Sequence, residues 1–422
     1  MVSIRDKLKR LDPENRKKQS PGESADKKET GVARQSETGD KRNVEIAVPG
    51  GIVKNDFGSF FCRRKNFDLA YRNGYHRLGV LNKLRQKVDP AENIFAAHTA
   101  GCSLEDFLFL DTETTGLAGG TGTIPFMVGL GYFASGEFIV EQLFMRDFEE
   151  EAGLLCRFQE LVRKHPVIIS FNGKTFDFPL LSTRLVLNRM QEVEIKYHLD
   201  LLYPSRRVWS YLDSCSLSSL ESHILGVKRK EDIPGSEVPQ VYFDYLNHGE
   251  TGKLRKVFEH NLIDIVSLVT LFTHLISVHR KDEAAQREAE EYYNLGRIYE
   301  KEKKISKSIF FYEQAREEAG TYLLSEIEKR LSWQYKRADR WREAAEIWET
   351  MISSGRGGIF PYRELAKYLE HRQKEYRRAE KYVEKALSLL RERRAIITDY
   401  EGEKGRLEHR LERLRGKTMR LF

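Results

Sequence analysis

Cysteines, long apolar runs and nucleotide-binding glycine motifs are scarce or missing in this 422-residue chain, and each absence excludes a class of protein. The four cysteines are scattered and form no C-x-x-C pair, so neither a zinc site nor a disulfide framework is predicted, and a reducing, cytoplasmic setting is expected. No apolar run approaches the ~18 residues that span a bilayer, and the charged N-terminus lacks the apolar core of a signal peptide. The glycine-rich stretch at 116–122 has no Walker lysine and no dinucleotide pattern, which argues against an ATP or NAD site. We therefore expect no membrane partner.

The chain is instead rich in charge. Charged residues make up 32% of it, and the formal net charge of +7 fits a polyanionic partner. The length suits two or three domains. Residues 1–43 hold few large apolar side chains and are expected to be disordered. Residues 44–104 are interpreted as a lead-in segment that packs on the next domain. Its interleaved basic and aromatic residues fit either a nucleic-acid track or a small core of its own.

The most informative segment is the acidic end of an apolar run, FLFLDTETTGL, at residues 107–117. Residues 107–110 are predicted to form a buried strand because they are apolar and β-prone. Asp111 and Glu113 are two residues apart, so an extended chain places both carboxylates on one face. Such a pair repels unless a cation or proton lies between its members, and hard oxygen ligands favour Mg²⁺ or Mn²⁺ over Zn²⁺. Taken alone, the pair is more typical of a solvated turn, and the later acidic motifs reverse that interpretation.

Two later segments supply further candidate ligands. A second apolar run at 167–171 leads into an Asn-Gly turn signal, and Pro179 suits the first turn of a following helix. Asp177 is therefore expected near a strand-to-helix junction. In the helical pattern at 259–268, His260 and Asp264 are four residues apart and share one face. This pair either completes a metal site or is an ordinary surface pair.

The order of elements predicts a mixed α/β sheet over residues 105–280. Two strands at 126–133 and 138–144, joined by a short turn, form a three-strand antiparallel meander with the first strand. A helix at 149–165 then returns the chain to a strand that starts at residue 167 and runs parallel to the first. Short strands that alternate with helices indicate helices on both faces of the sheet.

From about residue 284 the pattern changes to repeated helix pairs. Large and small residues recur 36 positions apart, for example Leu295 and Leu331, as in tetratricopeptide repeats. Small residues recur where two helices approach and large ones where stacked pairs bury their faces. Residues 284–400 are thus predicted to form tetratricopeptide-like repeats that bind a protein partner, with a plain helical bundle as the alternative. Residues 401–422 are expected to form a basic helix that caps the array or meets nucleic acid.

The acidic motifs, in the order D-x-E, F-D-x-P-L and H-N-x-x-D, resemble those of the DEDD superfamily of 3′-5′ exonucleases, which have a ribonuclease H-like fold. A narrower likeness is to the YprB-like family, bacterial ribonuclease H-like proteins with a tetratricopeptide tail. It rests on the segments at 119–126, 171–174 and 216–226. The nuclease resemblance covers about residues 105–275 and the whole architecture about 45–400. The chain departs from the superfamily at one position. One branch of the superfamily has a tyrosine four residues before the last aspartate, and another has a histidine five residues before it. Here His260 stands four residues before Asp264.

The resemblance implies a metal-dependent 3′-5′ exonuclease with two Mg²⁺ or Mn²⁺ ions, acting on a single-stranded 3′ end of DNA or RNA. His260 either orients the attacking water or is a hydrogen-bonding bystander, and Lys174 either meets phosphate or is merely solvated. A non-catalytic adaptor that binds nucleic acid and a structure-selective endonuclease stay open as alternatives. The implied metal ligands are Asp111, Glu113, Asp177 and Asp264. The implied substrate-binding residues are Thr114, Thr115, Leu117, Asn172 and Lys174.

Overall fold

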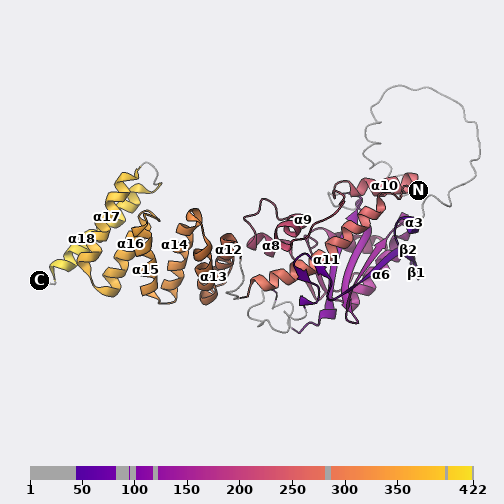
Figure 1. The fold of residues 1–422 in the computed structure, drawn as a ribbon, viewed down its shortest axis with the longest axis horizontal. Helices are drawn as coiled ribbons and strands as arrows, with labels where there is room; N and C mark the ends of the chain where they lie inside the picture. Colours follow the sequence, from indigo (N-terminus) through magenta and orange to yellow (C-terminus); the bar gives the residue numbers. More distant parts are fainter. Residues whose placement is uncertain are drawn as a thin grey trace, which may run out of the picture. The chain divides into compact units, whose positions relative to one another are not determined.

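A computed structural model describes residues 44–81, 95, 101–116, 122–280, 287–394 and 398–420 (Figure 1). The chain divides into two compact units. The first comprises residues up to Ser205 together with Ser214–Arg280, and the second comprises Arg206–Asp213 and the chain from Lys281 onward. The segment expected to be disordered, 1–43, lies outside the described residues, as does Leu117.

The first unit is built on a seven-stranded mixed sheet with the order β1-β2-β7-β6-β5-β8-β9. Neighbours from β1 to β5 pair antiparallel, whereas β8 and β9 run parallel to β5. The predicted meander with added parallel strands is thereby confirmed, and the β1–β2 hairpin widens the sheet beyond β7. The strands are β1 (Gly51–Asn55), β2 (Gly58–Asp68), β5 (Phe107–Thr114), β6 (Pro125–Ala134), β7 (Glu137–Phe144), β8 (Val167–Ser170) and β9 (Tyr197–Asp200). A separate two-stranded sheet holds β3 (Arg72–Asn73) and β4 (His76–Arg77).

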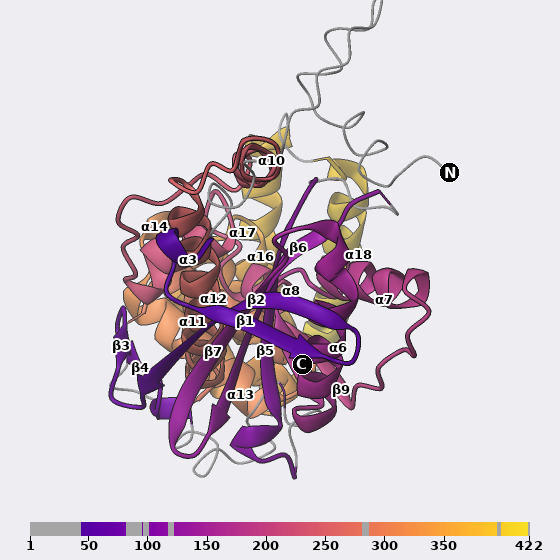
Figure 2. The ribbon, with the colours of Figure 1, turned by 90° about the vertical axis from the view of Figure 1, so that its right-hand side faces the viewer.

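Helices cover both faces of this sheet because side chains alternate along each strand. On one face, the rings of Phe107 and Phe109 pack against Phe272 of α11 (Leu254–Val278). On the other face, Arg157 of α6 (Glu151–Lys164) donates to the Glu141 carboxylate of β7. Figure 2 shows α11 and α6 on opposite sides of the strands. The remaining helical segments of this unit are α3 (Val44–Ala47), η2 (Leu104–Asp106), η3 (Phe148–Glu150), α7 (Asp177–Leu187), α8 (Leu202–Val208), which continues into the second unit, α9 (Leu217–Leu220), η4 (Glu221–Leu225) and α10 (Val238–His248).

The long helix α11 corrects one expectation. Among the described residues it is the one helix whose length and composition would allow it to cross a membrane, although the sequence analysis found no such run. Its apolar residues are interrupted by isolated polar ones, which conceals the run in the sequence. The helix packs on the sheet, and 83% of its most apolar stretch is buried inside the protein.

The second unit is all-helical in the residues that the structure describes, as predicted. Its helices approach closely at small residues: a Cβ added to Gly296 would lie 2.5 Å from the Tyr312 ring. The last helix, α18 (Tyr400–Met419), packs against the rest of the unit through Leu407 and Leu414, which are its two buried residues. The helical segments are α12 (Ala289–Lys301), α13 (Ile305–Glu318), α14 (Thr321–Arg337), α15 (Trp341–Ser353), α16 (Phe360–Tyr368), η5 (Leu369–Gln373), α17 (Tyr376–Glu392) and α18 (Tyr400–Met419).

Candidate active site

The first carboxylate of the site is held by the helix that covers it. Asp111 lies on β5 opposite Gly129 of β6, on the face that α11 covers. The fully buried Asn261 of α11 donates from Nδ2 to Asp111 Oδ2 over 2.9 Å. The same amide accepts from Gln142 Nε2 of β7, also over 2.9 Å. Three strands and one helix therefore fix the position of this carboxylate.

Glu113, His260 and Asp264 come together as a possible cation site. One ligand atom of each lies within 4.8 Å of the others. Glu113 Oε1 is buried and has no hydrogen-bond partner in the described structure. A buried carboxylate oxygen without a partner is costly, and a bound cation would satisfy it. The donor set of two carboxylates and one imidazole therefore fits a divalent metal ion.

Asp177 reaches the same region from the other side of β5. It is the first residue of α7, and its Oδ1 accepts from the Thr112 hydroxyl. The chain before it turns at Asn172, which has a φ of +65°. Gly173 follows, where a Cβ would come within 2.5 Å of the Ser170 hydroxyl and 3.1 Å of Asp177 Oδ2. The Asn-Gly turn predicted from the sequence therefore leaves room for this carboxylate beside the strand end.

Burial and crowding perturb three of these acids. Burial raises the pKa of Asp111 well above its usual range, and the nearby Asp264, Glu113 and Asp177 add to the effect. Burial likewise raises the pKa of Glu113, with Asp264 and Asp177 as further causes. The pKa of Asp177 rises to about 6, mainly through burial. Because these buried carboxylates repel one another when ionised, a proton or a cation between them is favoured.

The sequence analysis missed a largely buried arginine in the site, Arg229, whose side chain is 10% exposed. Arg229 donates to Asp264 Oδ1 and forms an ion pair with Glu221 at 2.5 Å. It also reaches Asp232 at 3.2 Å, and Asp232 in turn contacts His260 Nδ1 at 2.7 Å. Arg229 stands between Lys228 and Lys230, so the sequence resembles a solvated basic run. The one signal in the sequence that could have indicated Arg229 was Glu221, a carboxylate in the 216–226 segment to which no partner had been assigned.

The predicted substrate-binding residues are mostly engaged within their own loops. The Thr114 hydroxyl donates to the Gly116 carbonyl over 2.8 Å, and the Thr115 hydroxyl accepts from the Ile124 N–H over 3.0 Å. The N–H groups of Asn172 and Lys174 donate to the Asp200 carboxylate, over 2.8 and 3.1 Å.

The side chains of Asn172 and Lys174 remain exposed. Asp200 therefore shapes this turn, and its charge also contributes to the raised pKa of Asp177. Leu117 cannot be placed, because it lies outside the described residues.

Two comparisons with known proteins agree with this geometry. The RNase_H superfamily profile matches residues 108–276, which span β5 to α11 and hold all the acids above. Members of that superfamily are usually hydrolytic nucleases. A Bacillus subtilis (strain 168) protein named "Uncharacterized protein YprB" is 30% identical over 373 residues, which cover 86% of this chain and 87% of that protein. The similarity thus includes the helical unit as well as the sheet.

Proposed function

The chain belongs to the family of YprB, and from that membership and its acidic site we propose that it is a metal-dependent nuclease that trims DNA or RNA from the 3′ end. The observation that carries the proposal is the cluster of Glu113, His260 and Asp264 with its unpartnered, buried carboxylate oxygen. A buried carboxylate oxygen that never binds a ligand would destabilise the fold, and no contact among the described residues would offset that cost.

Asp111, Glu113, Asp177 and Asp264 would hold two Mg²⁺ or Mn²⁺ ions. When bound, such ions lower the pKa of an attacking water and stabilise the leaving 3′ oxygen. The protein fixes the geometry: Asn261 orients Asp111, and Thr112 orients Asp177. Asp232 contacts His260 Nδ1, which leaves Nε2 directed at Asp264, 3.4 Å away. His260 Nε2 would then either ligate an ion beside Glu113 and Asp264 or, left unligated, orient the water or take its proton.

One observation favours a second candidate, a non-catalytic adaptor that binds nucleic-acid ends. Arg229 already pairs with Asp264, so a guanidinium supplies some of the positive charge that a metal ion would bring. If that pair persists when nucleic acid binds, the domain recognises its target without cutting it. For the second unit, the repeat spacing supports a protein partner, and the scarcity of paired cysteines supports a cytoplasmic setting.

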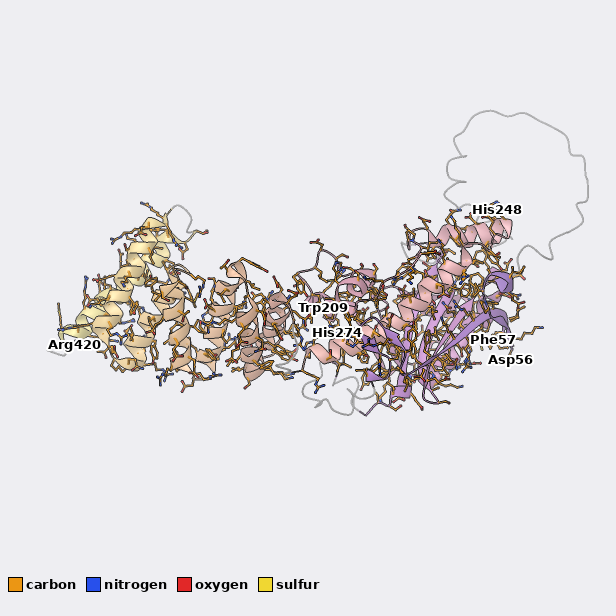
Figure 3. The ribbon with its side chains drawn as sticks, in the orientation of Figure 1. Asp56, Phe57, Trp209, His248, His274 and Arg420 are labelled. Atoms are coloured by element: carbon orange, nitrogen blue, oxygen red, sulfur yellow. The ribbon has the colours of Figure 1, made fainter. Side chains whose placement is uncertain are left out.

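The test is digestion of 5′-labelled single-stranded DNA and RNA with Mg²⁺ or Mn²⁺, with EDTA as the metal-free control. We expect a ladder that shortens from the 3′ end, and Asp111→Asn should slow it at least about a hundredfold, because metal catalysis is worth several kcal/mol. The matched control is Asp56→Asn, an exposed aspartate in the turn between β1 and β2 (Figure 3). It should digest at the wild-type rate.

The competing functions give different results in the same assay. Cutting of circular single strands would identify an endonuclease in place of an exonuclease. Binding of the labelled strands without metal-dependent cutting of either polymer would support the adaptor and overturn the nuclease proposal.

A further inference from the structure

The second unit carries two adjoining cavities with a basic lining. One has a volume of about 470 Å³ and is lined from α8, the loop after it, α12 and α14. The other, of about 510 Å³, lies at the C-terminal ends of α12 and α14. Glu300 and Lys301 line both, so the two form one surface, which we call the basic groove. Five arginines and two lysines line it against a single carboxylate.

Part of this positive charge is left without a carboxylate partner among the described residues, although Arg207, Arg330 and Arg337 have one. The one carboxylate, Glu300, is already bound by the Tyr312 hydroxyl at 2.7 Å and by Arg330 at 3.1 Å. By contrast, Arg206, Arg297 and Lys301 make no ion pair with any residue that the structure describes. The groove is therefore electrostatically suited to an anionic ligand.

A second, independent feature points to a ligand in the groove. The Gln334 side chain lines it and is 1% exposed, yet its Nε2 has no hydrogen-bond partner among the described residues. A buried amide donor without an acceptor is rare in proteins because it loses its hydrogen bonds to water. An acceptor oxygen of a ligand would satisfy it if the Gln334 side chain turned toward the groove.

We propose that the basic groove binds the phosphodiester backbone of a nucleic-acid strand. Guanidinium groups pair with phosphate through two parallel hydrogen bonds, which suits a lining dominated by arginine. Grooves that bind peptides instead present apolar pockets for anchor side chains, and only Ile298 and Ile305 are apolar among the residues that line this one. This inference goes beyond the nuclease proposal, because it gives the helical unit its own contact with nucleic acid.

The test measures binding of a fluorescein-labelled oligothymidylate to the full-length protein by anisotropy in EDTA, so it does not depend on cutting. Reversing two exposed charges, Arg297→Glu with Lys301→Glu, should weaken binding roughly tenfold or more and make its salt dependence shallower. The matched control makes the same charge change on α17, Lys381→Glu with Arg391→Glu, at exposed positions outside the groove. It should bind within about twofold of wild type, since long-range charge effects are screened.

Gln334→Leu separates a ligand role from a structural one. Replacing the orphan donor with an apolar side chain should leave the melting temperature unchanged or raised, while binding weakens severalfold. The proposal is overturned if the groove reversal binds no worse than its α17 control. It is also overturned if polyglutamate displaces the strand as well as unlabelled oligothymidylate at equal charge, which would identify an acidic protein segment as the ligand.

Discussion

The carboxylates of the candidate site differ in what surrounds each of them. Asp264 has a guanidinium beside it, Asp111 has one amide donor, and Glu113 keeps an oxygen with no partner. Arg229 thus offsets the charge on one side of the cluster, and the other side is where a cation gains most. Replacing Arg229 would leave the buried Glu221 without its counter-charge, so this arginine also has a structural role.

The raised pKa values make stability depend on pH and on metal. Asp177 titrates near 6 in the folded protein, against an ordinary value of 3.8, so the fold binds its proton more tightly than the unfolded chain does. Without metal, its deprotonation should therefore destabilise the protein as pH rises from about 4 to about 6, and the penalty persists above that. Mg²⁺ or Mn²⁺ should raise the melting temperature by several degrees at pH 7.5 and much less at pH 5. Thermal scans with and without EDTA measure this, and an equal metal shift at both pH values would contradict it.

At the scale of single residues, the sequence predicts those site residues whose positions depend only on local spacing. Asp111 and Glu113 share a face because a strand has a period of two, and both lie where that rule places them. Asn261 and Arg229 were not predicted, because their roles depend on which strand α11 crosses and on a loop that brings residue 229 back over Asp264. Such long-range pairings leave no spacing signal in a single sequence.

At the scale of elements, the site depends on how closely α11 approaches the sheet. Two glycines of β6 permit that approach: a Cβ on Gly129 would lie 2.3 Å from Asn261 Oδ1, and one on Gly131 would lie 2.5 Å from Ile265 Cγ2. The sequence FMVGLGYF predicted a strand, but it did not predict that its two glycines leave room for α11. The place of the β1–β2 hairpin beside β7 likewise follows from long-range pairing that local patterns do not encode.

Gly129→Ala is therefore expected to push α11 away from β5. Overpacking of this kind costs about 1–3 kcal/mol of unfolding free energy, and the displaced Asn261 should lower nuclease activity as well. Gly51→Ala in β1 is the matched control, since nothing lies within 4 Å of the added Cβ. Denaturant unfolding and the digestion assay measure the two effects. A Gly129→Ala protein as stable as the Gly51→Ala protein would mean that the helix does not depend on this contact.

At the scale of the whole molecule, the candidate metal site and the tryptophans belong to different units. All four tryptophans, Trp209, Trp333, Trp341 and Trp348, belong to the second unit, and Trp209 is labelled in Figure 3. The candidate metal ligands all belong to the first. Tryptophan fluorescence therefore reports on the second unit, whereas a metal ion at the candidate site would stabilise the first. Their unfolding can be followed separately in the intact protein.

The last helix gives a way to perturb the second unit alone. The fully buried Glu370 pairs with Arg410, Arg413 and Lys417 of α18. Although burial opposes it, hydrogen bonds from Arg413 and Lys417 hold the pKa of Glu370 down at about 2. This carboxylate therefore stabilises the fold above about pH 4.5, and its contribution is lost as pH falls toward 2.

At neutral pH, Glu370→Gln should remove about 1–3 kcal/mol and lower the midpoint detected by tryptophan fluorescence by several degrees. Mn²⁺ should leave that midpoint unchanged, yet raise the midpoint of the first unit's own transition in far-ultraviolet circular dichroism, because the candidate metal ligands all lie in the first unit. Arg342→Gln, which removes an exposed ion pair on α15, is the control and should move neither midpoint. If Mn²⁺ shifted the tryptophan signal as far as the dichroism signal, the two units would unfold as one. In that case the helical unit would have to contribute directly to the stability of the metal site.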